Sequence, residues 1–386
     1  MRKISIVALI LALSVVFTAC TSDEMKLYNA FIKSEDITSM ESDVNINFSF
    51  EAEGFPEEAQ QGFQEVAKML KDSEVSFHQK MVQNKEKTAA KAQVDMGLNF
   101  GGMKTDMNVW VNTDMSSDTP KMIEIIKMPP LFMSQMSPED ESKEYIVYDF
   151  EDMMNSNEEK IDFKELMNFS REMQPKILDF MKNYHKNFDL DFKIASYRGR
   201  QTIDGKTLLI YQVKLDDKSF KDLVRYIVNN SMDNEETMKF IEEYMNIVMS
   251  SAQIPEAEKE VAKEEINKGI EDLQKDLPKL KKQFNDFMDT FEDIKVLGEK
   301  GIVIEYGINN DGYIVYEDGK IDLNIDLKAI GNMLDKDIEE DMGTLKLGIN
   351  YNAKIYNINK DINIDLPVVN EKNAIYYNDL MDQVNN

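Results

Sequence analysis

The sequence predicts an α+β protein in which a large curved antiparallel β-sheet, a half-barrel, is covered on its apolar face by helices. Apolar and polar residues alternate in many runs of the first and last thirds of the chain, which is the period of strands with one buried face. Between them, from about residue 151 to 291, apolar residues recur mostly at helical spacing. A sheet that is apolar on one side needs a cover, and this helical central block supplies it.

The first third of the chain predicts an opening helix and a meander of antiparallel strands. Apolar residues occupy every second position in each strand run, as in Val44, Ile46 and Phe48. The expected helices cover 24–40 and 56–70, and the expected strands cover 44–50, 75–81, 94–100, 103–111, 121–128 and 145–150. Residues 129–138 contain three prolines and predict a loop. Its apolar side chains should be buried, or should contact a ligand or a membrane.

Two hairpins predict the register of this meander. A two-residue loop places the residues that flank it on the same face of the sheet. A loop of two glycines therefore makes Phe100 face Met103, and a loop at Lys85-Glu86 pairs Met81 with Ala90. Both pairs are apolar, so the meander should have one wet face and one apolar face.

The centre and the end of the chain predict further helices and strands. Asp204-Gly205, Asp311-Gly312 and Asp318-Gly319 are turn signals, and Pro278 is expected to kink or break a helix. The expected helices cover 163–184, 218–250 and 255–291, and the expected strands cover 188–197, 207–215, 302–308, 321–327, 345–355 and 362–366.

The first twenty residues predict export and attachment to a membrane. Arg2 and Lys3 precede an apolar run, Ile4–Phe17, that is shorter than the about 20 residues a bilayer span requires. Phe17-Thr18-Ala19-Cys20 resembles the bacterial lipoprotein box. The resemblance implies that residues 1–19 are a signal peptide and that Cys20 carries a diacylglyceryl group on its sulfur. An ordinary signal peptide, in which Cys20 has no role, is the alternative.

The lipid would hold the protein on the extracytoplasmic side of the cell membrane, because two acyl chains suffice for stable anchoring. Cys20 is the only cysteine, so no internal disulfide forms and residues 20–386 should fold as one domain on their core alone. Removing Arg2 and Lys3 leaves a formal charge of 43 − 72 = −29. Such acidity repels nucleic acid and anionic lipids. We therefore expect a monomer with no nucleic-acid partner.

The order of the elements, together with short motifs, resembles the LolA/LppX-like superfamily, and within it an uncharacterised group of lipoproteins from Gram-positive bacteria. The motifs are the lipoprotein box, the strand Thr207–Val213, and Ile362–Pro367 followed by Glu371–Ile375. The resemblance covers most of residues 21–386 and brings no catalytic residues. It implies a curved sheet wrapped round helices with an apolar cavity for acyl chains. Members with known roles carry lipoproteins or lipids across the envelope.

Methionine is abundant, with 26 residues, and several lie on the expected apolar face of the meander. Methionine adapts to varied apolar partners, which suits a cavity for mixed acyl chains, although core packing explains the same residues equally well. On the cavity interpretation, Met96, Phe100, Met103 and Met107 contact the ligand.

Arg198, Arg200 and Tyr211 belong to the same candidate site if Asp204-Gly205 forms a two-residue loop. Arg200 then faces Leu209 and Arg198 faces Tyr211, on the inward side. Two cations at the rim of an apolar pocket could hold an anionic headgroup. A shifted register would place both arginines in solvent.

Enzymatic and metal-binding motifs are missing from the sequence. His78 falls on the polar face of its strand and His185 ends a helix, so a solvated histidine is expected at each position. No nucleophile elbow, phosphate-binding loop or dinucleotide fingerprint occurs. The acidic run 335–341 lacks the glycine and the spaced glutamate of a calcium loop, which favours a solvated loop. We expect no catalytic residue, metal or cofactor.

Two functions remain open at this point. The first is a non-enzymatic lipoprotein that binds a lipid or other apolar ligand between sheet and helices. The second is a surface structural or interaction lipoprotein without a small-molecule ligand. Its polar face, rich in Asn and Asp, would contact a protein partner or the cell wall.

Overall fold

The computed structural model describes residues 22–71, 73–116, 121–136, 142–150, 192–251, 256–333 and 342–377, with shorter pieces between 169 and 184. The expected signal peptide and Cys20 lie outside these residues. Most of the helix expected at 163–184, His185 and the acidic run 335–341 lie outside them as well.

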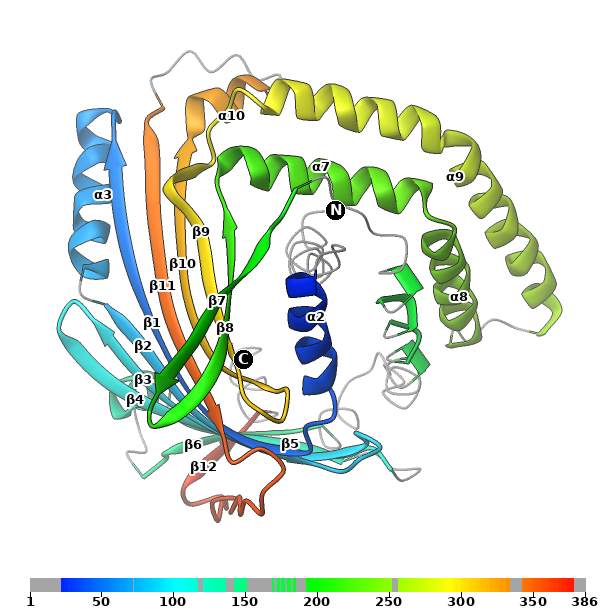
Figure 1. Ribbon diagram of the computed structural model, residues 1–386. Coiled ribbons are helices and arrows are strands. Elements are labelled where there is room, and N and C mark those ends of the chain that lie inside the picture. The colour runs from blue at the N-terminus through cyan, green and yellow to red at the C-terminus, as the bar shows by residue number, and fades with distance from the viewer. Residues whose placement is uncertain are drawn as a thin grey trace.

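One open sheet of twelve strands organises the described residues (Figure 1). Its order is β12-β6-β5-β4-β3-β2-β1-β11-β10-β9-β8-β7. Neighbouring strands are antiparallel except β12 and β6, which are parallel. The strands are β1 (Ser39–Glu53), β2 (Glu74–Gln83), β3 (Ala89–Phe100), β4 (Met103–Asp114), β5 (Lys121–Lys127), β6 (Tyr145–Asp149), β7 (Ala195–Ile203), β8 (Lys206–Leu215), β9 (Leu297–Ile308), β10 (Ile314–Asp326), β11 (Thr344–Tyr356) and β12 (Ala374–Tyr376).

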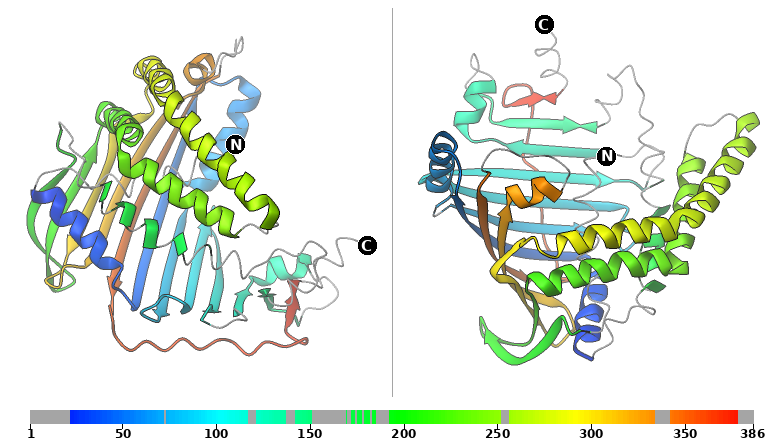
Figure 2. Two further views of the ribbon diagram at one scale, coloured as in Figure 1. Left: turned by 90° about the vertical axis from the view of Figure 1, so that its right-hand side faces the viewer. Right: turned by 90° about the horizontal axis from the view of Figure 1, so that it is seen from above.

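The helices lie mainly on one side of this curved sheet. They are α2 (Ser22–Ser34), α3 (Glu57–Leu70), α4 (Pro130–Met136), α7 (Asp217–Asp233), α8 (Glu235–Ser251), α9 (Glu256–Phe291) and α10 (Leu327–Met333). α2 lies in the hollow of the sheet, and α7, α8 and α9 arch over its open side (Figures 1 and 2). The predicted α+β class, with a large curved sheet covered by helices and not closed into a barrel, is confirmed.

The concave face of the sheet is its apolar face. On β1, Val44 and Ile46 are half-buried, while Asn45 between them points to the opposite face and is exposed. The register continues this face sideways, because Val44 lies opposite Ala353 of β11 and Phe77 of β2. We call the opposite side of the sheet, which is polar on β1 and β11, the outer face.

The first turn of α2 is joined to the start of β7. The side chain of Glu24 is fully buried, and its Oε1 accepts hydrogen bonds from the backbone N–H groups of Ile194 at 2.9 Å and Ala195 at 3.3 Å. Leu27 and Tyr28, one turn later, are buried in a cluster with side chains of β7 to β10. The carboxylate therefore satisfies strand donors where the edge of the sheet meets the helix.

A buried lysine joins α7 to the end of α9. Lys221 Nζ donates to the carbonyl oxygens of Glu292 at 2.8 Å and Ile294 at 2.7 Å, and lies 2.7 Å from Asp217 Oδ2. Burial opposes ionisation of Asp217, but N–H donors of the β9 start and the Lys221 ammonium together hold its carboxyl pKa below the usual range. This pair fixes the arch of helices to the sheet.

Three expected loops differ in the structure. The β2–β3 loop is longer than two residues, so Met81 lies opposite Ala92 instead of Ala90. A shift of two residues keeps each side chain on its face, so the alternation is preserved. Residues 129–138 are not wholly a loop, because α4 forms there and buries Met133. Asp318-Gly319 makes no turn and lies inside the continuous strand β10.

The last expected strand, 362–366, does not form. Residues 357–373 instead run as an extended strap from the end of β11 to β12. The strap is tied to the start of β1, because Asn359 Oδ1 accepts hydrogen bonds from Thr38 and Lys360 O accepts one from Ser39. The strap therefore carries the chain from β11 to the far edge of the sheet, where residues 374–376 form β12.

Candidate ligand-binding face

Full burial of apolar side chains is confined to the two ends of the sheet. Among the described strands, such side chains lie on β5, β6 and β12 at one end and on β7 to β10 at the other. β1 to β4 and β11 carry none, although their concave side is apolar. Apolar side chains of these middle strands that stay half-buried include Val44, Ile46, Phe48, Phe77, Met96, Leu98, Met107, Val109 and Ile349. We call this set the open apolar face.

Three of the expected site residues lie on this face. Met96 of β3 lies directly opposite Met107 of β4, and both are half-buried. Phe100 lies opposite Met103, as the two-glycine hairpin predicts. Met103 itself is 73% exposed at the hairpin tip, so it lies beyond the covered part of the sheet. The structure therefore brings Met96 and Met107 together, and places the Phe100–Met103 pair four residues farther along the same hairpin, at its tip.

The other three expected site residues lie at the opposite end of the sheet. Tyr211 on β8 is 1% exposed and packs in the core beneath α2. Arg200 faces Leu209 as expected, but a bulge places Tyr197, and not Arg198, opposite Tyr211. Both arginines are exposed: the bulge moves Arg198 away from Tyr211, and Arg200 keeps its expected register but lies on the edge strand β7. They form no rim around the methionines, because β2, β1, β11, β10 and β9 lie between β3 and β8.

A cavity of about 310 Å³ opens at one end of the open apolar face, beneath α2. Phe31 of α2, Met40 of β1, Met81 of β2 and Ile355 of β11 give it apolar walls. Glu317 of β10 also lines it and belongs to the same concave face, since it lies in register with Ala353 and Tyr306. The cavity thus combines apolar walls with an acidic group.

Burial changes the acid–base behaviour around Glu317. Desolvation raises the pKa of the Glu317 carboxyl. Burial, and then the neighbouring Glu317, also raises the pKa of Tyr351. The pKa of Tyr306 is raised by burial first, and by Tyr351 and Glu317 after it. These three groups lie on the concave face, which is mainly apolar around them.

Glu317 is a site residue that the sequence analysis does not find. Asp318-Gly319 predicts a turn, which removes Glu317 from the strand that follows. The alternation of the strand could have placed Glu317 on the apolar face. Every second residue of a strand lies on the same face, so Leu323, Ile321, Gly319 and Glu317 share one. The glycine is needed for another reason, because a Cβ at Gly319 would lie 1.9 Å from Cε1 of Tyr351. The Tyr351 ring therefore covers this glycine on the concave face.

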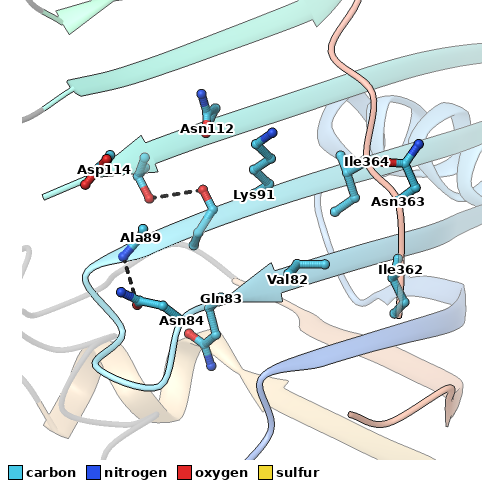
Figure 3. A pocket seen from close by; sticks show the side chains of 12 residues that line it. Val82, Gln83, Asn84, Ala89, Lys91, Asn112, Asp114, Ile362, Asn363 and Ile364 are labelled. Carbon is cyan, nitrogen blue, oxygen red and sulfur yellow. Dashed lines mark hydrogen bonds between the residues drawn. The ribbon is translucent and has the colours of Figure 1, made fainter. Parts of the chain in front are cut away.

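A hollow of about 540 Å³ lies where the strap crosses the ends of β2 to β4 (Figure 3). Its walls mix Lys91, Asn112 and Asp114 with Ile362 and Ile364 from the strap. Ile364 is 5% exposed, so the strap buries part of its own apolar surface there. This hollow is separate from the open apolar face and is explained by the docking of the strap.

His78 lies on the outer face, as predicted. Its Nδ1 is 2.8 Å from Asp43 Oδ1, and both side chains are more than a third exposed. Asp95, across the β2–β3 pair, accepts a hydrogen bond from Asn108 Nδ2 at 2.7 Å. Within the described residues, no three His, Cys, Asp or Glu side chains are grouped so that they could hold a metal ion. None of the helices in that part of the chain is long and apolar enough to cross a membrane.

Comparisons with known proteins leave the family open. No protein-family model matches the sequence, and no curated protein sequence matches it. Among solved structures, the crystal structure of a DUF1329 family protein from Desulfovibrio piger aligns with 89% of this chain and 95% of that chain. The sequence identity is 9% and the TM-score is 0.21, which is too low to support an inference about this protein.

Proposed function

We propose that this protein is an extracytoplasmic lipoprotein, anchored through Cys20, that binds a lipid or another apolar ligand on its open apolar face. The observation that carries the proposal is the half-buried state of the apolar side chains on the middle strands. Apolar area left in water costs about 25 cal/mol per Å². A ligand with an acyl chain would remove this area from water.

The chemistry of the face supports an apolar ligand of variable shape. Met96 and Met107 lie side by side, and methionine side chains adapt to different partners at little cost. The sheet is open, so a chain could enter from the side without unfolding the protein. The sequence motifs that resemble LolA/LppX-like proteins imply an apolar cavity for acyl chains between a curved sheet and helices. The proposed ligand would occupy the same place.

Matched substitutions on the two faces of β1 test the proposal. Ile46 lies on the open apolar face, and its neighbour Asn47 is exposed on the outer face. Each is replaced by Gln in a soluble form that begins after Cys20, and displacement of a fluorescent naphthylamine probe by the neutral amphiphile dodecyl maltoside is measured. Ile46→Gln should weaken binding about tenfold, because it places an amide against the chain.

Asn47→Gln is the control and should bind as the wild type does. Equal binding by both variants and the wild type, or no binding by any form, would contradict the proposal. The anchor is tested separately in the full chain. Cys20→Ser should move the protein from the membrane fraction to the soluble fraction, and continued membrane retention would contradict lipidation.

A further inference from the structure

The cavity beneath α2 holds the carboxyl group of Glu317, which has no cation beside it among the described residues. Among the described residues that line the cavity, Lys87 is the only cation, and its Nζ already lies 2.5 Å from Glu35 Oε2. Within the described part of the chain, the Glu317 carboxyl makes no ion pair and no hydrogen bond. The cavity therefore offers one uncompensated acidic group among apolar walls.

An unpaired carboxyl on an apolar surface destabilises the folded protein, because its charged form loses water without gaining a partner. A group of this kind in a cavity is a candidate for ligand recognition. Its surroundings favour one type of ligand over others. Tyr306 lies directly across the β9–β10 pair from Glu317, and Tyr351 is its diagonal neighbour on β11. Neither tyrosine lines the cavity, and Tyr306 is 5% exposed, so the carboxyl itself supplies the attraction for an ammonium group.

We propose that this cavity binds the ammonium headgroup of a cationic amphiphile whose apolar chain lies along the open apolar face. This inference rests on the proposed function and specifies its ligand. Met40 and Met81, which line the cavity, continue into the rows of β1 and β2 that contain Val44 and Phe77. A single ligand can therefore place its charge at Glu317 and its chain on the middle strands.

The charge of the protein favours the same ligand class. The formal net charge of −27 attracts cations toward the surface and repels anions. A fatty-acid carboxylate or a phosphate headgroup beside Glu317 would meet a like charge in a poorly solvated place. These anionic ligands would need Glu317 to be protonated, and they form the competing outcome of the test.

Three probes that share a twelve-carbon chain separate these possibilities. They are dodecyltrimethylammonium, dodecyl sulfate and the neutral dodecyl maltoside, titrated below their micellar concentrations into the full-length protein in nanodiscs of a neutral phospholipid. Dodecyltrimethylammonium should bind at least about tenfold more tightly than dodecyl sulfate. The same preference should be lost in Glu317→Gln, which removes the charge and keeps the shape.

Asp318→Asn is the matched control, because Asp318 is the next residue on β10 and its side chain lies on the outer face. This variant should keep the wild-type preference for the cationic probe. Glu317→Asp retains the charge and should keep most of the preference for the cationic probe. This variant can be measured even if Glu317→Gln does not fold.

The outcomes distinguish this inference from the proposed function. Binding of all three probes with equal affinity, or tighter binding of dodecyl sulfate, overturns the ammonium site and leaves the apolar ligand. Failure of every probe to bind overturns both.

A second measurement uses the wild-type protein alone. Raising the pH ionises Glu317, so binding of the permanently cationic probe should strengthen with pH, while binding of the neutral probe should not. The groups that face Glu317 from neighbouring elements are the Lys87–Glu35 pair, Tyr306 and Tyr351. The pKa values of both tyrosines are raised above their usual value, so the tyrosines stay neutral while the rise in pH ionises Glu317. A flat response of the cationic probe contradicts the inference.

Discussion

Two carboxyl groups on the concave side of the sheet, those of Glu24 and Glu317, differ in their partners and therefore in their roles. Glu24 is fully buried but accepts two backbone hydrogen bonds at the start of β7, so it stabilises the docking of α2. Glu317 is half-buried on the concave face, and its carboxyl has no partner in the described part of the chain. A buried carboxyl with hydrogen-bond partners contributes to the fold, whereas an unpaired carboxyl in a cavity is a candidate for ligand recognition.

Replacing Glu24 by Ala should destabilise the protein strongly. Loss of the carboxylate leaves the N–H groups of Ile194 and Ala195 without this acceptor, and the expected cost is about 3 kcal/mol. The free energy of unfolding in urea measures it. Lys193→Ala is the control, because Lys193 belongs to a partly exposed ion pair with Asp23 and should cost less than about 1 kcal/mol. Equal costs for the two variants would show that Glu24 has no special role.

Strand β10 shows where element prediction from the sequence succeeds and where it fails. The alternation of Ile321, Leu323 and Ile325 predicts the strand and its apolar face. Asp318-Gly319 predicts a turn, because glycine after aspartate usually marks one. The structure instead uses Gly319 to make room for the Tyr351 ring from β11. Local sequence does not reveal that contact, because Tyr351 is 32 residues away.

A pair of substitutions tests this explanation of Gly319. Gly319→Ala should destabilise the protein by about 1–3 kcal/mol, because the new Cβ overlaps the Tyr351 ring. The same change in a Tyr351→Val background should cost little, since the ring is gone, and a double-mutant cycle measures the coupling. Gly62→Ala in α3, where a Cβ meets nothing within 4 Å, should stabilise the helix by up to about 1 kcal/mol. Additive effects of the first two changes would contradict the proposed contact.

The strand meander is predictable for a physical reason. A residue's face follows from its parity, so even the error of two residues at the β2–β3 loop leaves Met81 and Phe77 on the apolar side. The strap is harder to predict. Ile362 and Ile364 have the period of a strand, but their backbone joins no sheet, and Ile364 packs against the ends of other strands. Periodicity identifies apolar surface, not the element that covers it.

At the scale of the whole molecule, the sheet is covered unevenly. α2 and α7 bury the concave face at β7 to β10, and α4 packs on it near β6. The middle strands lack fully buried apolar side chains. The sequence predicts the apolar face and several of its residues, including Met96 and Met107. Which part of the face stays open depends on helix docking through contacts such as Glu24 and Lys221, and no local pattern encodes these.

The central claim is that the open apolar face binds an apolar ligand. The most direct measurement is native mass spectrometry of the protein purified from its own membrane without added lipid, followed by organic extraction of what it releases. The account predicts an additional mass on the folded protein and an extract dominated by amphiphiles that carry an ammonium group. A folded protein with no added mass beyond the lipid on Cys20 would contradict it and would favour a surface interaction protein.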